Sequence, residues 1–249
     1  MVKTFCVNLV TKKIHEQAKV LFDELDIKDV KFSNSTPHKL GGKYGCYDSH
    51  LNVWKDFYTN FPDEKYCFIF EEDVTINKEQ VEMSYYKEII SQANTFVKNN
   101  YEHIDFVFLK NNCFELASEI NNKLFTKGFG FTTHAYIVTR QYIENIIKKN
   151  NNIFPVPINS HIDFEITMNY NSIVYSEKIY YLKKIGFEQL DNTVNQTSNS
   201  YTNIINFSEK YIMTAPATKF ILFFNYINKY LNINSYFYKT IIIILSNLY

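Results

Sequence analysis

Three carboxylates follow directly on an apolar segment, and their placement could hold a cation. Residues 66–70 read YCFIF, and Glu71, Glu72 and Asp73 come next. Five β-prone residues in succession predict a buried strand, and open α/β sheets bind their ligands at the carboxyl ends of such strands. Glu71 and Asp73, two positions apart, point to the same side of an extended chain, so they can share one divalent cation. The alternative interpretation is a polar strand end before a helix N-terminus, where acidic side chains are also favourable.

The composition excludes several functional classes. The chain has 249 residues, of which 46% are hydrophobic and 21% charged, as is typical of a folded protein with an ample core. Its 26 basic and 26 acidic residues balance, and Arg140 is the only arginine, so the sequence predicts no nucleic-acid partner. The four cysteines form no CxxC pair, which argues against a zinc site or a disulfide framework. A reducing, cytoplasmic location follows, and the N-terminal sequence has no signal-peptide pattern.

The elements that must position the three carboxylates alternate along the chain. Apolar residues at alternating or consecutive positions predict strands at 4–10, 29–33, 66–70, 104–109 and 133–138. Apolar residues at spacings of three and four predict helices at 14–25, 44–58 and 78–98, with another starting at 142–147. The stretch between 110 and 128 is expected to be rich in loops. This alternation predicts an α/β fold, with a mainly parallel sheet and helices on both faces.

The C-terminal part of the chain has a different composition. A polar, turn-like stretch follows Leu190, and residues 219–249 are crowded with Ile, Leu, Phe and Tyr. The longest uninterrupted apolar run, Ile241–Leu245, is far below the roughly 18 residues that span a bilayer. We expect a main domain over 1–200 and a helical segment over 201–249. That segment would dock on the domain or on a second protomer as a homodimer, or make a peripheral membrane contact.

Four short segments resemble glycosyltransferase family 25, the lipooligosaccharide and collagen galactosyltransferase type. Residues 41–57 (GGKYGCYDSHLNVWKDF) resemble the family's G-x-x-G-C-x-x-S-H element with a tryptophan after it, and residues 67–74 (CFIFEEDV) resemble its strand ending in E-D-D. Residues 129–147 and 155–166 resemble two later elements through Tyr136, Arg140 and Asp163, among others. The ordered resemblance covers about four fifths of the chain. It departs from the family at Glu72, where aspartate is usual.

The resemblance implies a GT-A type fold, a Rossmann-like sheet that binds a nucleotide sugar at its strand ends. It also implies an inverting transfer of a hexose, galactose or glucose, from a UDP-sugar, with Mn²⁺ or Mg²⁺ as the cation. The acceptor would be a hydroxyl of a glycan or of a glycosylated or hydroxylated protein. A cation held by carboxylates suits this chemistry, because a diphosphate leaving group develops negative charge.

The resemblance also implies roles for individual residues. Glu71 and Asp73 would bind the metal. Inverting transfer needs a further carboxylate as general base for the acceptor hydroxyl, and this role falls to Asp163, with Glu165 as its competitor. Contacts to the nucleotide or the metal-binding loop are expected from the remaining candidates, which are Val7, Asn8, Leu9, Ser49, His50 and Glu72. A histidine on an apolar helical face can equally be a hydrogen-bonded core residue, and Trp54 is expected to be core packing.

Two other functions remain open at the level of sequence. A degenerate glycosyltransferase domain could serve as a binding or scaffold protein, because position 72 is Glu and no third metal ligand is evident. A nucleotidyltransferase would also use clustered acids and a metal. It usually has a glycine-rich phosphate loop near the N-terminus, and no such loop precedes Gly41 and Gly42.

Overall fold

The computed structural model describes most of the N-terminal three quarters of the chain. The chain divides into two compact units, 1–193 and 194–249, and every described residue belongs to the first. The expected C-terminal segment 201–249 lies outside the described residues. No helix within the described part is long and apolar enough to cross a bilayer. The described residues are 2–8, 12–34, 38–110, 113–115, 120–130, 133–157, 162–163, 166 and 178–189.

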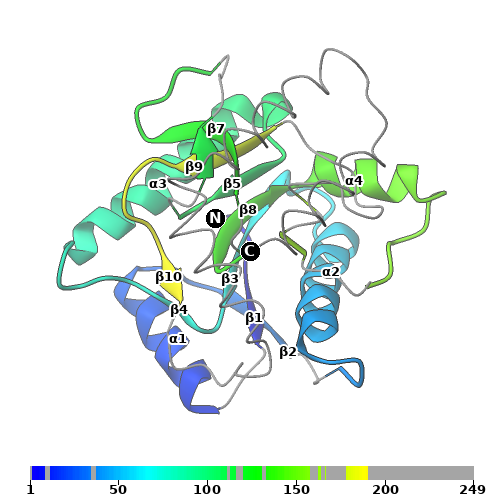
Figure 1. Cartoon of the computed structure of the whole chain (residues 1–249), viewed down its shortest axis with the longest axis horizontal. Coiled ribbons are helices and arrows are strands. Elements are labelled where there is room, and N and C mark those ends of the chain that lie inside the picture. Colours follow the sequence, from blue (N-terminus) through cyan, green and yellow to red (C-terminus); the bar gives the residue numbers. More distant parts are fainter. Residues whose placement is uncertain are drawn as a thin grey trace, which may run out of the picture. The chain divides into compact units, whose positions relative to one another are not determined.

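Within these residues, eight strands form one central sheet in the order β2-β1-β3-β8-β5-β9-β7-β6 (Figure 1). Six of the eight run in the same direction, because only β8 and β7 are antiparallel to the strands on both sides of them. A separate two-stranded ladder pairs β10 with β4. The strands are β1 Thr4–Asn8, β2 Val30–Asn34, β3 Tyr66–Glu71, β4 Val74–Thr75, β5 Phe106–Phe108, β6 Cys113–Glu115, β7 Phe125–Gly130, β8 Ala135–Thr139, β9 Ile179–Leu182 and β10 Glu188–Gln189.

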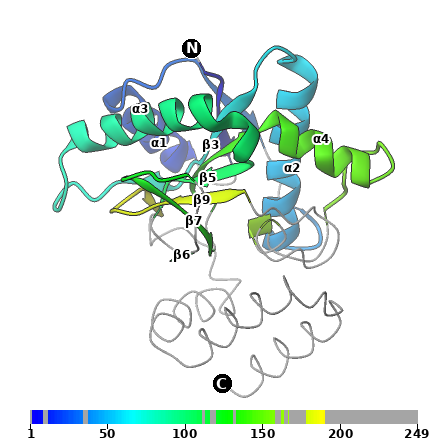
Figure 2. The ribbon, with the colours of Figure 1, turned by 90° about the horizontal axis from the view of Figure 1, so that it is seen from above.

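Helices cover both faces of the sheet. The helices α1 (Lys12–Glu24) and α3 (Met83–Asn100) pack on one face, and α2 (Gly42–Asn60) and α4 (Arg140–Lys149) pack on the other (Figure 2). A short 3₁₀ helix, η1 (Tyr101–His103), follows α3. This arrangement confirms the predicted α/β fold class, a Rossmann-like and mainly parallel sheet with helices on both faces.

The prediction that the stretch between 110 and 128 is rich in loops is wrong in part, because this stretch contains β6 and the start of β7. These strands lie at one edge of the sheet. Residues 126–128 of β7 are Thr, Lys and Gly, so this strand lacks the continuous apolar run that marks a central strand. Helix α3 begins at Met83 rather than at 78, since 78–80 form a turn.

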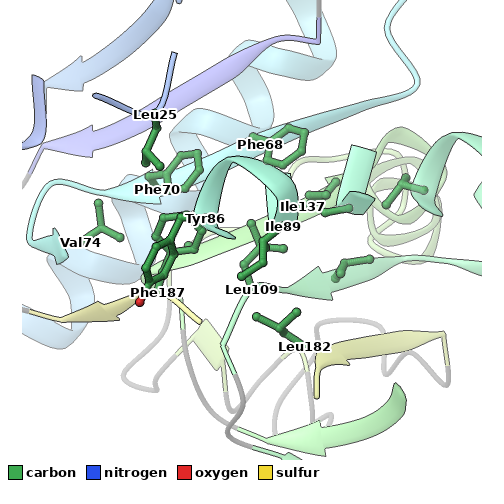
Figure 3. Close-up of a cluster of buried hydrophobic side chains, with 14 of the residues drawn as sticks. Leu25, Phe68, Phe70, Val74, Tyr86, Ile89, Leu109, Ile137, Leu182 and Phe187 are labelled. Atoms are coloured by element: carbon green, nitrogen blue, oxygen red, sulfur yellow. The ribbon is translucent and has the colours of Figure 1, made fainter. Parts of the chain in front are cut away.

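Two buried clusters lie on opposite faces of the sheet, and β3 contributes to both by alternation. Phe68 and Phe70 pack with side chains of α1 and α3 (Figure 3), whereas Cys67 and Ile69 pack with α2 and α4. Because successive strand residues point to opposite faces, Glu71 continues the second series. Its carboxylate is therefore directed toward α2.

The only arginine of the chain holds the C-terminal end of α2. Pro62 has no N–H, so the Tyr58 carbonyl, four residues earlier, lacks its usual backbone donor. The Arg140 Nη1 atom donates to this carbonyl at 3.1 Å. The same guanidinium also donates to the carbonyls of Phe57, Phe61 and Glu64. Arg140 therefore anchors α2 to the junction of β8 and α4.

Candidate metal centre

Glu71 lies between two histidines at the end of β3. The antiparallel register of β3 and β8 pairs Phe70 with Ala135, and the Glu71 N–H donates to the His134 carbonyl at 2.9 Å. The His134 Nδ1 atom lies 3.2 Å from Glu71 Oε2. On the other side, His50 Nε2 from α2 lies 3.2 Å from Glu71 Oε1. Each carboxylate oxygen thus has its own imidazole partner, and all three side chains are buried.

The orientation of His50 is set by two aromatic residues behind it. Trp54 Nε1, which can only donate, reaches the Tyr136 hydroxyl at 3.0 Å. That hydroxyl lies 2.9 Å from His50 Nδ1. Burial raises the pKa of Tyr136 well above its usual range, so the hydroxyl keeps a proton to donate. Because the Tyr136 hydroxyl donates a hydrogen bond to His50 Nδ1, the N–H of the ring lies on Nε2 and donates to Glu71 Oε1.

Charge is distributed unevenly over the two metal-ligand candidates. Burial alone would raise the pKa of Glu71, but hydrogen bonds from His134 and His50 outweigh it and hold that pKa well below its usual range. The pKa of Asp73 is raised, first by burial and then by the nearby charge of Glu71, although His134 and Gln189 oppose this. Glu71 is therefore the firmly ionised carboxylate of the pair.

Asp73 is oriented by a residue from the far end of the described chain. The Gln189 Nε2 atom donates to Asp73 Oδ2 at 2.7 Å, and β10 reaches this point by pairing with β4. The chain leading to β10 passes directly over Leu109. A Cβ at Gly186 would lie 2.2 Å from the Leu109 carbonyl oxygen, so only glycine fits this close approach.

The structure brings the predicted ligands Glu71 and Asp73 together and adds His134 to them. One ligand atom from each of the three lies within 4.8 Å of the other two. Two carboxylates and an imidazole suit a divalent cation such as Mn²⁺, so these residues fit the metal that the sequence resemblance implies. A second group, Cys46, His50 and Glu71, meets the same distance limit.

The other sequence candidates lie around this centre to different degrees. Glu72 and Val7 are buried neighbours, since the Glu72 N–H donates to the Val7 carbonyl at 3.0 Å. Ser49 is buried, but its hydroxyl donates within α2 to the Gly45 carbonyl. Asp163 is also buried. The side chain of Asn8, and all of Leu9 and Glu165, lie outside the described residues.

Asp163 lies within electrostatic reach of the centre. Burial raises the pKa of the Cys46 thiol well above its usual range, and the charges of Glu71, Asp163 and Asp73 raise it further, in that order. The negative charges of the three carboxylates that the sequence singled out therefore all act on this one thiol of α2. The structure thus supports the proximity of these carboxylates, while their roles remain predictions.

Sequence reasoning missed two residues of this centre, His134 and Gln189. His134 lies inside the predicted strand 133–138, directly before its apolar part, and pairing of that strand with the predicted strand 66–70 would have placed it beside the acids. The antiparallel direction of β8 was the missing fact. Gln189 had no signal, because its position depends on a ladder of two-residue strands.

The chain was compared with solved structures, with curated proteins and with models of protein families. The solved structures that were matched include a glycosyltransferase involved in the glycosylation of the major capsid of PBCV-1, with 11% identity, 79% of this chain and 98% of that chain covered, and a TM-score of 0.46. Another is A197 from STIV, with 11% identity, 77% and 87% covered, and a TM-score of 0.40. A third is mannose-1-phosphate geranyltransferase from Thermus thermophilus, with 5% identity, 76% of each chain covered, and a TM-score of 0.45.

TM-scores below 0.5 at such identities carry no argument about fold or function. No curated protein matches the sequence significantly. The model of glycosyltransferase family 25, described as an LPS biosynthesis protein family, matches residues 10–164, which is more than half of the chain and includes α2, the Glu71 centre and Asp163. The chain belongs to glycosyltransferase family 25.

Proposed function

We propose that this glycosyltransferase is a metal-dependent inverting hexosyltransferase. It would move galactose or glucose from a UDP-sugar to a hydroxyl of a glycan or protein acceptor. The observation that carries the proposal is the buried donor set of Glu71, Asp73 and His134 at the carboxyl end of β3. This is the edge of an α/β sheet at which nucleotides bind.

The cation at this donor set would supply neutralisation of the charge that develops on the diphosphate leaving group. The protein's part is to keep the donors in place. His50 and His134 each hold one oxygen of Glu71, and Gln189 holds one oxygen of Asp73. Since each carboxylate is fixed by a neighbour, the ligands are arranged before the cation and the donor bind.

Asp163 would be the general base, with Glu165 as its competitor. A base must lie across the sugar from the leaving group and take the proton of the acceptor hydroxyl as the new bond forms. Asp163 is buried, and its charge acts on Cys46 together with the charges of Glu71 and Asp73. This proximity supports Asp163 as the base.

The third donor also bears on the alternative of an inactive scaffold. The sequence pattern showed no third metal ligand, and this favoured a domain that had lost turnover. His134 fills that gap with an imidazole 3.2 Å from Glu71. A complete donor set supports an active enzyme over a degenerate one.

The substitution Asp73→Asn tests the proposal. It keeps the size of the side chain and removes its charge, so we expect loss of Mn²⁺-dependent UDP binding without loss of the fold. Calorimetric titration with UDP, in the presence and absence of Mn²⁺, measures this. Asp63→Asn, at an exposed carboxylate, is the matched control and should bind as the wild type does. Equal affinities of Asp73→Asn and wild type would contradict the assignment.

The donor sugar calls for a separate experiment. Metal-dependent release of UDP from UDP-glucose, UDP-galactose and UDP-N-acetylglucosamine would identify it. Release of another nucleotide product, with none of these donors turned over, would favour the nucleotidyltransferase alternative. Binding of UDP without turnover of any donor would favour the scaffold.

A further inference from the structure

We propose that Cys46, His50 and Glu71 form a second cation site, one that selects a thiophilic divalent ion such as Zn²⁺. The sulfur of Cys46, a ring nitrogen of His50 and an oxygen of Glu71 all lie within 4.8 Å of one another. Thiolate, imidazole and carboxylate are the three side-chain ligands that zinc uses. The observations that support this site do not rest on the transfer reaction proposed above.

The positions of Cys46 and His50 on α2 suit joint coordination. Residues four apart lie on the same face of a helix, one turn from each other, and both side chains turn toward Glu71. His50 is fully buried and Cys46 partly buried. The scattered cysteines argued against zinc at the level of sequence, because a site with one thiol needs partners that only the fold supplies.

The charges favour a cation at this point. Glu71, Asp163 and Asp73 all add to the negative potential at the Cys46 thiol. When a divalent ion binds, the thiol gives up its proton to solvent and becomes a thiolate ligand. The two positive charges of the ion are then balanced by one thiolate and one carboxylate, and the imidazole adds no charge.

A second layer of contacts is already in place for His50. A metal-bound imidazole normally donates its other N–H to an oxygen nearby. Here Nε2 faces Glu71, and Nδ1 faces the Tyr136 hydroxyl at 2.9 Å. Coordination through Nε2 would place the ring proton on Nδ1. The Tyr136 O–H would then turn away from the ring, and the Tyr136 oxygen would accept a hydrogen bond from Nδ1–H.

Glu71 belongs to both donor sets, and this couples them. Its Oε1 atom faces His50 and its Oε2 atom faces His134. Cations on the two sides would therefore share one carboxylate and repel each other. We expect Zn²⁺ at the thiol site to weaken Mn²⁺ binding by Glu71, Asp73 and His134.

Cobalt spectroscopy of the full chain tests the thiol site. Titration of Co²⁺ into the metal-free protein should give a thiolate-to-cobalt charge-transfer band, and Zn²⁺ should remove this band. Absence of the band in the wild type would overturn the proposal without any variant. Neither result depends on activity, so failure here leaves the transferase proposal standing.

Variants then identify the ligands. Cys46→Ser and His50→Gln should each lose the band, whereas Cys6→Ser, Cys67→Ser and Cys113→Ser should keep it. His134→Gln should also keep the band, because His134 belongs only to the carboxylate site. A band that survives in Cys46→Ser, or that disappears in His134→Gln, would overturn the assignment. Binding of Mn²⁺, followed from the electron paramagnetic resonance signal of the free ion, should weaken when Zn²⁺ is added to the wild type, and Cys46→Ser should need more Zn²⁺ for the same loss.

Discussion

Replacement of Arg140 by methionine should destabilise the fold by about 2–4 kcal/mol. The guanidinium donates to four backbone carbonyls at distances from 2.6 to 3.3 Å. Two of them keep another donor, since the Phe57 carbonyl accepts from the Phe61 N–H and the Phe61 carbonyl from the Glu64 N–H. The Tyr58 carbonyl has no such replacement, because Pro62 supplies no N–H.

The magnitude follows from those partners. A hydrogen bond from a charged donor contributes about 1.5–3 kcal/mol, and an abandoned buried carbonyl costs about 1–3 kcal/mol. Two carbonyls, those of Tyr58 and Glu64, lose the donor that the structure gives them. Arg140 is only partly buried, so water can replace some of the hydrogen bonds that its guanidinium donates. The expected loss of stability therefore lies toward the lower end of these ranges. Contacts of the guanidinium with the rings of Phe57 and Tyr58, each at 5.1 Å, are lost as well.

Urea denaturation measures this difference in the free energy of unfolding. Arg140→Lys should lose about half as much as Arg140→Met, because an ammonium group keeps the charge but cannot reach all four carbonyls. Lys149→Met, at an exposed position near the end of α4, is the matched control and should stay within about 0.5 kcal/mol of wild type. A loss below about 1 kcal/mol in Arg140→Met would refute the view that this residue anchors α2.

Two further predictions concern the carboxylates. Asp163→Asn should lower turnover by about 10²–10⁴-fold with nearly unchanged donor binding; if Glu165→Gln shows that loss instead, Glu165 is the base. In metal-free buffer, the free energy of unfolding should fall as the pH drops below 4.5, the ordinary pKa of Glu71, because its depressed pKa in the folded state means that the unfolded chain takes up the proton first. Glu71→Gln should flatten this dependence in urea denaturation at pH 3–6, and an equally steep slope would count against the pairing with His50 and His134.

Most helices and strands could be predicted because their apolar residues recur at the spacing of a helix or of a strand. The helical stripe at Ala18, Leu21 and Phe22 is buried as expected, and so is Trp54 on α2. The continuous apolar run before Glu71 is a central strand, since both of its faces are covered by helices. In such segments the residues that the sequence pattern marks as apolar are the ones that the fold buries.

Other features depend on pairing, which a single sequence does not encode locally. The direction of β8 decides that His134, rather than a residue at the other end of that strand, meets Glu71. The contact of Gln189 with Asp73 needs the ladder of β4 and β10. The acids themselves could be found because they follow an apolar run, whereas their partners come from distant segments that carry no comparable signal.

The place of β8 in the sheet bears on how the enzyme matures. Strands β1, β2 and β3 are neighbours both in the sheet and in the first part of the chain, whereas β8 is inserted between β3 and β5 although it is synthesised after both. Until it docks, the nascent chain presents β3 with an open, apolar edge of the kind that recruits other strands. The same docking step covers that edge and delivers His134 to Glu71. Closure of the sheet and completion of the proposed donor set are therefore a single event, and a chain that stalls before it would be prone to aggregate and would lack the proposed cation site.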